Sequence, residues 1–199
     1  MTFVATSTDG ILFTPHVSPP LGIFYWRVFR YNHIWYAMAK GGLLYRSKTG
    51  GMGDFEVGFN ILPGGDTRDK NATDVDKNGS GPRHVAVHLT DTNKLYVYYS
   101  NIGDSPERIM RCEFDLKTDA VDWSLWKDLG TCSSPDEILR PEKLWEGSDL
   151  PLTTSKSGEA KQRENAVRDP AIFVDNDKQV YLLYSVAGEN GIGIARVIG

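Results

Sequence analysis

The chain contains 199 residues, with 22 lysines and arginines against 26 aspartates and glutamates, so its formal net charge is −4 at pH 7. This acidic balance lacks the basic footprint expected of a nucleic-acid-binding protein. Hydrophobic residues make up 40% of the chain, but no run of them approaches the ~18 residues of a membrane-spanning helix. The length allows one large domain or two small ones.

The N-terminal residues predict a hairpin. Residues 3–7 and 11–13 are strand-like and flank Asp9 and Gly10, which favour a tight turn. The first ten residues contain no basic segment followed by an apolar stretch, so we expect no signal peptide and a cytoplasmic protein.

Three later segments repeat one pattern, a strand, a polar turn and a second, more apolar strand. The paired strands are expected at 25–31 with 34–39, at 83–89 with 95–100, and at 168–174 with 180–185. A third strand follows each pair, at 43–47, 109–114 and 192–197, and a fourth follows the second unit at 123–126. We expect no helix beyond a single turn over 135–139.

Repeated antiparallel units of up to four strands are typical of β-propeller blades. Because each blade packs between neighbours, its central strands are apolar on both faces, as in 95–99. We therefore expect an all-β fold, with 1–199 forming one partial propeller domain of about three and a fraction blades. Its expected parts are a blade remnant over 1–20, blades over about 22–62, 83–130 and 168–199, and long loops over 64–82 and 130–165.

The predicted ring is incomplete. Closure needs at least ~4 blades, so two alternatives remain open. The chain is part of a longer protein, or it assembles with another copy through exposed blade edges.

One long loop and the two cysteines raise the question of metals and disulfides. Asp74, Asp76 and Asn78 have the spacing that opens a calcium loop, but the twelfth position is Val85 instead of a bidentate glutamate. A flexible polar loop is the default, with a loop calcium as the alternative, and we expect no other cofactor.

Two cysteines, Cys112 and Cys132, are too few for a zinc site. They could pair, but we expect two free thiols.

The third unit carries a family resemblance. The run Arg168-Asp169-Pro170-Ala171-Ile172-Phe173, followed by Val180-Tyr181-Leu182-Leu183-Tyr184-Ser185, resembles the blades of five-bladed propeller glycoside hydrolases, the group of arabinanases, β-xylosidases, invertases and levansucrases. The tracts 5–13 and 46–50 resemble the Ser-x-Asp-Gly turns of that group. The resemblance implies a carbohydrate ligand and two or three carboxylates around the mouth of a central funnel.

Asp169 is the main candidate for such a carboxylate. Glycoside cleavage needs one carboxylate facing the anomeric carbon and a protonated carboxyl group beside the leaving oxygen. Asp169 opens an inner strand before Pro170, and the resemblance implies that it stabilises the transition state. Its alternative role is to cap a turn. The catalytic base of the group lies in a first blade that has no counterpart in this chain, so hydrolysis by that mechanism is in question.

Other candidates follow from their positions in the units. Arg27 and His84 begin the first strands of the first two units, as Asp169 does in the third, so we expect these three side chains to converge on one opening. The candidate catalytic residues are Asp169, Glu107 and Glu146, and the candidate substrate-binding residues are Arg27, His84, Arg168, Trp26, Trp145, Glu142 and Glu189. The alternative for each glutamate is a solvated surface position.

The sequence thus favours a glycoside hydrolase-like protein that acts on or binds a carbohydrate at the propeller funnel. The alternatives are a non-catalytic propeller that binds carbohydrate or protein, and a truncated fragment. Whether the protein is an enzyme stays open. Its expected partners are a carbohydrate and a second copy of the chain, but neither nucleic acid nor a membrane.

Overall fold

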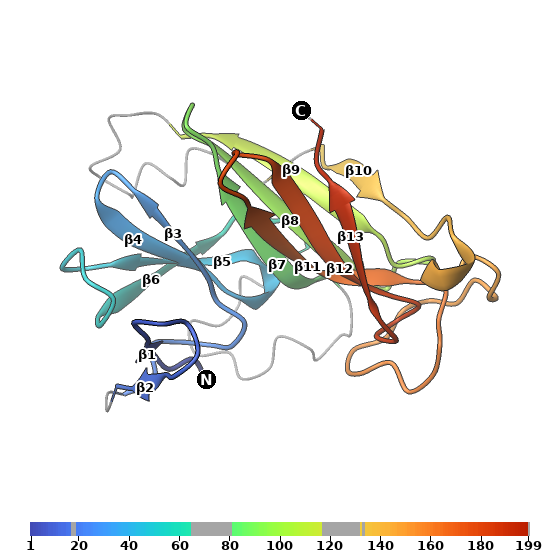
Figure 1. Ribbon diagram of the computed structural model, residues 1–199, viewed down its shortest axis with the longest axis horizontal. Helices are drawn as coiled ribbons and strands as arrows, with labels where there is room; N and C mark the ends of the chain where they lie inside the picture. The colour runs from blue at the N-terminus through green and yellow to red at the C-terminus, as the bar shows by residue number, and fades with distance from the viewer. Residues whose placement is uncertain (17–18, 65–80, 117–131, 133, 199) are drawn as a thin grey trace.

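The computed structural model describes residues 1–16, 19–64, 81–116, 132 and 134–198. In this part of the chain the fold is all-β, as the sequence predicts, with a two-stranded hairpin and three larger antiparallel sheets (Figure 1). The two helical segments described, η1 (Lys40–Gly42) and η3 (Leu144–Glu146), are single turns and are too short to cross a bilayer.

The strands follow one another in chain order within each sheet. The hairpin joins β1 (Ala5–Thr6) to β2 (Thr14–Pro15), and the first sheet contains β3 (Arg27–Tyr31), β4 (Ile34–Met38), β5 (Leu43–Ser47) and β6 (Phe55–Asn60). The middle sheet contains β7 (Gly81–Leu89), β8 (Lys94–Ile102), β9 (Ile109–Asp115) and β10 (Asp136–Leu139). The third sheet contains β11 (Val167–Val174), β12 (Val180–Val186) and β13 (Ile192–Arg196).

The middle sheet packs on both of its faces. Side chains alternate along β8, so Val97 and Tyr99 point into one core and Tyr98 into the other. The first core includes Tyr36 of the first sheet, and the second includes Leu182 of the third. This arrangement confirms the prediction that the central strands are apolar on both faces.

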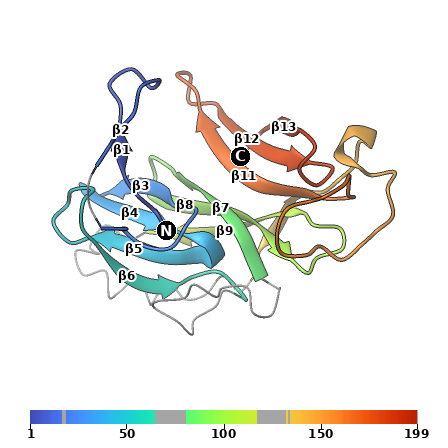
Figure 2. The same cartoon turned by 90° about the horizontal axis from the view of Figure 1, so that it is seen from below.

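The first strand of each large sheet lies at an edge of that sheet. In the middle sheet this strand is β7, which contacts both β3 and β11, so the three edge strands come together (Figure 2). Residues that begin these strands are therefore brought close to one another although they are far apart in the sequence.

Two local predictions are wrong. The second strand of the N-terminal hairpin is expected at 11–13, but Asp9 Oδ1 accepts the backbone N–H groups of Ile11 and Leu12 at 2.8 and 2.9 Å and draws them into the turn. The paired strand is therefore β2. The helical turn expected over 135–139 is the strand β10, which pairs with the free edge of β9. The outer strand expected at 123–126 lies outside the described residues.

The expectation of two free thiols is also wrong, because Cys112 and Cys132 form a disulfide. Cys112 lies on β9 and its side chain is buried in the first core, while Cys132 packs against the same core. The backbone N–H of Cys132 donates to the carbonyl of Ile61 at 3.1 Å, which fixes the Cys132 backbone beside a residue of this core.

Reducing this disulfide should destabilise the fold. The bond links cysteines that are 20 residues apart in the sequence. A disulfide that closes a loop of this length stabilises the folded state by about 3 kcal/mol, mainly by reducing the conformational entropy of the unfolded chain. Guanidinium unfolding with and without reductant measures the difference. The Cys132→Ser variant is the control, since reductant should leave its midpoint unchanged. Coincident wild-type transitions in both conditions would contradict the account.

Candidate functional site

His84 and Asp169 lie at irregularities of the two edge strands β7 and β11. The register between β7 and β8 shifts between Pro82 and Val85, and that between β11 and β12 shifts between Arg168 and Ala171. Bulges of this kind break the regular ladder and re-aim side chains. Asp169 also has a left-handed backbone, with φ of 53°. The sequence contributes to this break, because Pro170 has no N–H to donate to a ladder.

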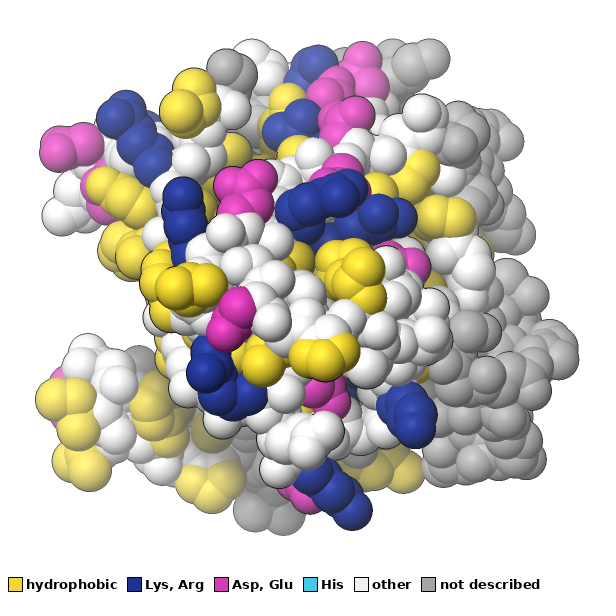
Figure 3. All heavy atoms as spheres, turned by 90° about the vertical axis from the view of Figure 1, so that its right-hand side faces the viewer, with side chains coloured by type: hydrophobic (Ala, Val, Ile, Leu, Met, Phe, Trp, Pro, Cys, Tyr) yellow, Lys and Arg dark blue, Asp and Glu magenta, His cyan; other side chains and the backbone are white. Residues whose placement is uncertain are grey.

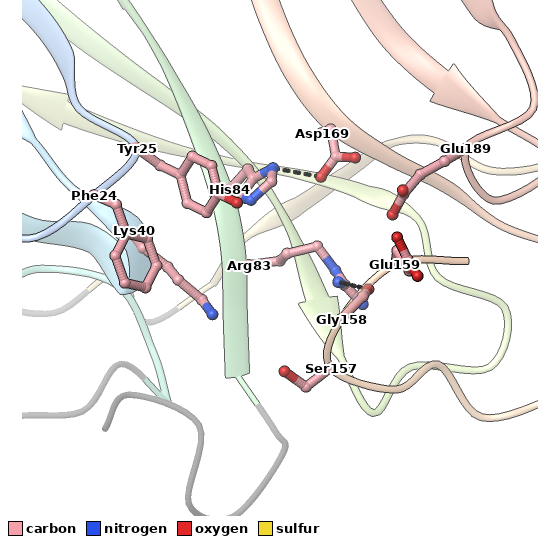
Figure 4. A pocket seen from close by; sticks show the side chains of 10 residues that line it. All are labelled: Phe24, Tyr25, Lys40, Arg83, His84, Ser157, Gly158, Glu159, Asp169 and Glu189. Carbon is pink, nitrogen blue, oxygen red and sulfur yellow. Dashed lines mark hydrogen bonds and ion pairs between the residues drawn. The ribbon is translucent and has the colours of Figure 1, made fainter. Parts of the chain in front are cut away.

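The two side chains meet across the space between the sheets (Figure 4). His84 Nδ1 lies 2.6 Å from Asp169 Oδ1, and Ser185 Oγ donates a hydrogen bond to Asp169 Oδ2 at 3.3 Å. On its other side the His84 ring packs against the Tyr25 ring, with 3.9 Å between the centroids. These contacts hold both groups at the rim of one pocket.

This environment keeps Asp169 ionised. Burial by itself raises the pKa of the carboxyl group, but the hydrogen bond from His84 and the charges of His84, Arg83 and Arg168 outweigh burial, so the pKa lies below its usual range. At neutral pH Asp169 can therefore accept hydrogen bonds or stabilise positive charge. It cannot protonate a leaving group.

The pocket has a volume of about 320 Å³ and opens between the first and third sheets. Its charged groups have both signs, which suits a ligand with several hydroxyl groups better than one with a large net charge. The lining residues are Phe24, Tyr25, Lys40, Arg83, His84, Ser157, Gly158, Glu159, Asp169 and Glu189.

A buried cluster of charges lies behind the pocket. Glu107 is fully buried, and its carboxylate contacts Arg83 and Arg168, which are 5% and 1% exposed. Burial raises the pKa of Glu107, and the two guanidinium groups oppose this shift. Arg83 also donates to the carbonyl of Gly158 at 3.0 Å, so the cluster holds the loop that closes one side of the pocket (Figure 4).

The structure brings some of the candidate residues together. Asp169, His84 and Glu189 line the pocket, and Arg168 lies directly behind it, with Nη1 3.5 Å from Glu189 Oε1. Glu107 belongs to the buried cluster and has no exposed surface, so it cannot reach a substrate as a catalytic acid would have to.

Glu146 and its neighbours lie away from this pocket. The Glu146 carboxylate is buried and accepts hydrogen bonds from the backbone N–H groups of Glu142 and Lys143 and from the Tyr184 hydroxyl, at 2.8 to 2.9 Å. It therefore caps the single turn η3. Glu142 and Trp145 are exposed on the same segment and do not line the pocket.

Arg27 and Trp26 also lie outside the pocket. Arg27 Nη1 donates to the carbonyl of Trp26 at 3.3 Å, and the Trp26 ring packs against Tyr45 and Phe55. The residue that meets His84 is Tyr25, two positions earlier, so the expected convergence of Arg27, His84 and Asp169 holds only for the last two.

Sequence reasoning missed several lining residues. Tyr25 is the first residue of the first repeat, and that position could have identified it as a candidate. Ser157, Gly158 and Glu159 belong to the long loop predicted over 130–165, and loops of such length are often functional. Phe24 and Lys40, whose ammonium lies 5.5 Å from the Phe24 ring centroid, carried no signal.

No metal cluster is found within the described residues, and Asp74, Asp76 and Asn78 lie outside them. On the face shown in Figure 3, lysine and arginine side chains are interspersed with aspartates, glutamates and separate hydrophobic patches. Such a mixture gives this face no uniform field to steer a highly charged ligand, as far as its described residues go.

Replacing Asp169 by asparagine should change how stability depends on pH. A folded-state pKa below the unfolded value of about 4 means that ionised Asp169 stabilises the fold above pH ~4, and this contribution disappears as the pH falls through the lower folded-state pKa. We expect the unfolding free energy of Asp169→Asn to be below that of the wild type at pH 7 and to converge with it in acid. Urea unfolding across this range measures both curves, and a constant offset would contradict the role of the carboxylate.

Comparison with known proteins adds to this geometry. No protein-family model matches the chain. An uncharacterised protein of Acanthamoeba polyphaga mimivirus is 36% identical over 197 residues, which cover 98% of this chain and 52% of the relative. The chain therefore spans about half the length of this curated relative.

Solved structures of family-43 glycoside hydrolases are similar in fold. An endo-1,5-α-L-arabinanase from Thermotoga petrophila RKU-1 has a TM-score of 0.53 at 15% identity, over 89% of this chain and 38% of that one. The family-43 YxiA protein from Bacillus licheniformis has a TM-score of 0.53 at 17% identity, over 92% of this chain and 38% of that one. At such low identity the likeness establishes architecture alone, and that architecture is a glycoside hydrolase-like propeller.

Proposed function

We propose that the protein binds a carbohydrate in the pocket lined by His84 and Asp169. The observation that carries this proposal is the ionised carboxylate of Asp169, held by His84 and Ser185 at the rim of a pocket that also contains an aromatic ring. Carboxylates form strong hydrogen bonds to hydroxyl groups, and the half-exposed Tyr25 ring offers an apolar face on which a sugar can stack.

The finer architecture belongs to the same proposal. The sheets β3–β6, β7–β10 and β11–β13 would be three successive blades of a five-bladed type, with the hairpin β1–β2 as the remnant of another, all in one domain. Their antiparallel order and the meeting of β3, β7 and β11 support this assignment. The pocket would then lie at the funnel, where propellers bind ligands.

Hydrolysis of the bound glycan is a second candidate. Three carboxyl groups, those of Asp169, Glu159 and Glu189, line one pocket, and glycoside cleavage needs two. Asp169 would stabilise positive charge at the anomeric carbon. One of Glu159 and Glu189 would protonate the leaving oxygen as the general acid, and the other would accept the proton of the attacking water, because Glu107 and Glu146 are buried and occupied by other partners.

Carbohydrate binding should depend on the charge of Asp169. We expect calorimetric titration with a panel of neutral oligosaccharides to show binding, and Asp169→Asn to weaken it by about tenfold or more, since a hydrogen bond to a charged group contributes about 1.5–3 kcal/mol. Glu142→Gln is the control, because this glutamate is exposed outside the pocket and its loss should leave affinity unchanged. Equal affinity of Asp169→Asn and the wild type would remove Asp169 from the binding site.

Hydrolysis is tested by the release of reducing ends from the oligosaccharides that bind, because their sugar leaving groups need protonation by an acid. We expect this release to fall by at least ~10²-fold in Glu189→Gln and in Glu159→Gln, with oligosaccharide binding retained. Turnover that survives both substitutions together would exclude these residues as the acid. Binding without turnover by the wild-type protein would leave the non-catalytic function.

A further inference from the structure

The carboxylate of Glu107 is buried in an unusual position. It lies in the turn between β8 and β9, has no exposed surface, and does not face the pocket. A buried charge is costly unless it is paired and hydrogen-bonded. The groups that pair with the Glu107 carboxylate therefore indicate its role in the structure.

Glu107 joins two sheets through one carboxylate. Its Oε1 accepts hydrogen bonds from Arg83 Nε at 3.0 Å and from Ser100 Oγ at 2.7 Å. Its Oε2 lies 3.1 Å from Arg168 Nε and 3.4 Å from Arg83 Nη2. Arg83 belongs to β7 and Arg168 to β11, so the same two oxygens hold the beginnings of both edge strands.

The backbone of Glu107 adds a third connection. Its carbonyl accepts the N–H of Val167 at 3.0 Å, and the residue forms an isolated parallel bridge with Ala166. The chain is therefore fixed immediately before Arg168. Glu164 also pairs with Arg168 but is part-exposed, so Glu107 is the buried member that orders this arginine.

The positions of the two arginines in the sequence explain how Glu107 can affect the residues of the pocket. Arg83 directly precedes His84, and Arg168 directly precedes Asp169. The contacts place these neighbours differently: both guanidinium groups reach Glu107, while His84 and Asp169 meet each other at the rim of the pocket, which Arg83 also lines. Both pairs lie where the register of their sheet shifts, and a regular ladder does not fix them there.

We infer that Glu107 is a positioning residue, which holds Arg83 and Arg168 and thereby keeps His84 and Asp169 in contact. Its role does not depend on the ligand of the pocket, because the contact between His84 and Asp169 exists in the protein alone. A protein that binds no carbohydrate would therefore leave this inference intact. Likewise, if Glu107 does not position His84 and Asp169, the proposal of carbohydrate binding is unaffected.

The contact itself can be observed by NMR in protein labelled with ¹⁵N-histidine. In the wild type we expect a low-field Nδ1 proton resonance of His84, identified by its absence in His84→Ala, that also disappears in Asp169→Asn. Glu107→Gln removes the charge that holds both arginines, and we expect it to lose this resonance. The matched control is Glu146→Gln, which removes another buried glutamate that does not contact the two arginines, and should keep the resonance.

The control separates positioning from stability, because both substitutions remove a buried carboxylate and both should lower the denaturation midpoint. A second variant, Glu107→Asp, keeps the buried charge and the fold but is too short to reach both arginines, so we expect it to weaken the resonance as well. A His84 resonance that persists unchanged in Glu107→Gln and Glu107→Asp would overturn the inference. So would its equal loss in Glu146→Gln.

Discussion

The pocket depends on one buried carboxylate between two arginines. Glu107 lies in the turn between β8 and β9, and its partners Arg83 and Arg168 begin the edge strands of two different sheets. Breaking up such a buried group of charges is far more costly than losing a surface ion pair. The cluster therefore specifies how β7 and β11 meet, and the residues beside the arginines become the rim of the pocket.

Apolar packing sets the wider frame in which this cluster lies. The middle sheet uses both faces, with Tyr99 of β8 in one core and Tyr98 in the other, so it connects the first sheet to the third. The disulfide joins Cys112 of β9 to Cys132 at the edge of the first core. Packing thus brings the sheets together without fixing the orientation of individual side chains at their edges. Hydrogen bonds and charges supply that orientation at His84 and Asp169.

Much of the fold could be predicted because strands have a strong local signal. Alternating and continuous apolar runs placed β3 to β5, β7 to β9 and β11 to β13 within a few residues of where they lie. The errors have particular causes. The Asp9 side chain captures the N–H groups of Ile11 and Leu12, and β10 forms because the edge of β9 is available. Neither competition is visible in a hydrophobic pattern.

The site was predictable only in part. The start of the third repeat pointed to Asp169, and the equivalent position in the second pointed to His84. In the first repeat the residue that meets His84 is Tyr25, because β3 begins two residues later and its first residue, Arg27, turns elsewhere. The burial of Glu107 and Glu146 depends on contacts with residues distant in the sequence, such as Arg168 and Tyr184, so composition and spacing could not distinguish them from surface glutamates.

The coupling of Arg83 and Arg168 through the buried carboxylate of Glu107 is tested most directly by a double-mutant cycle on unfolding free energy with Arg83→Met and Arg168→Met. Each single variant leaves Glu107 one guanidinium partner, whereas the double variant leaves it none. We expect the double variant to lose at least ~1 kcal/mol more than the sum of the single losses, as coupled residues do. Losses that add within ~0.5 kcal/mol would show that the two arginines act independently and would contradict the account.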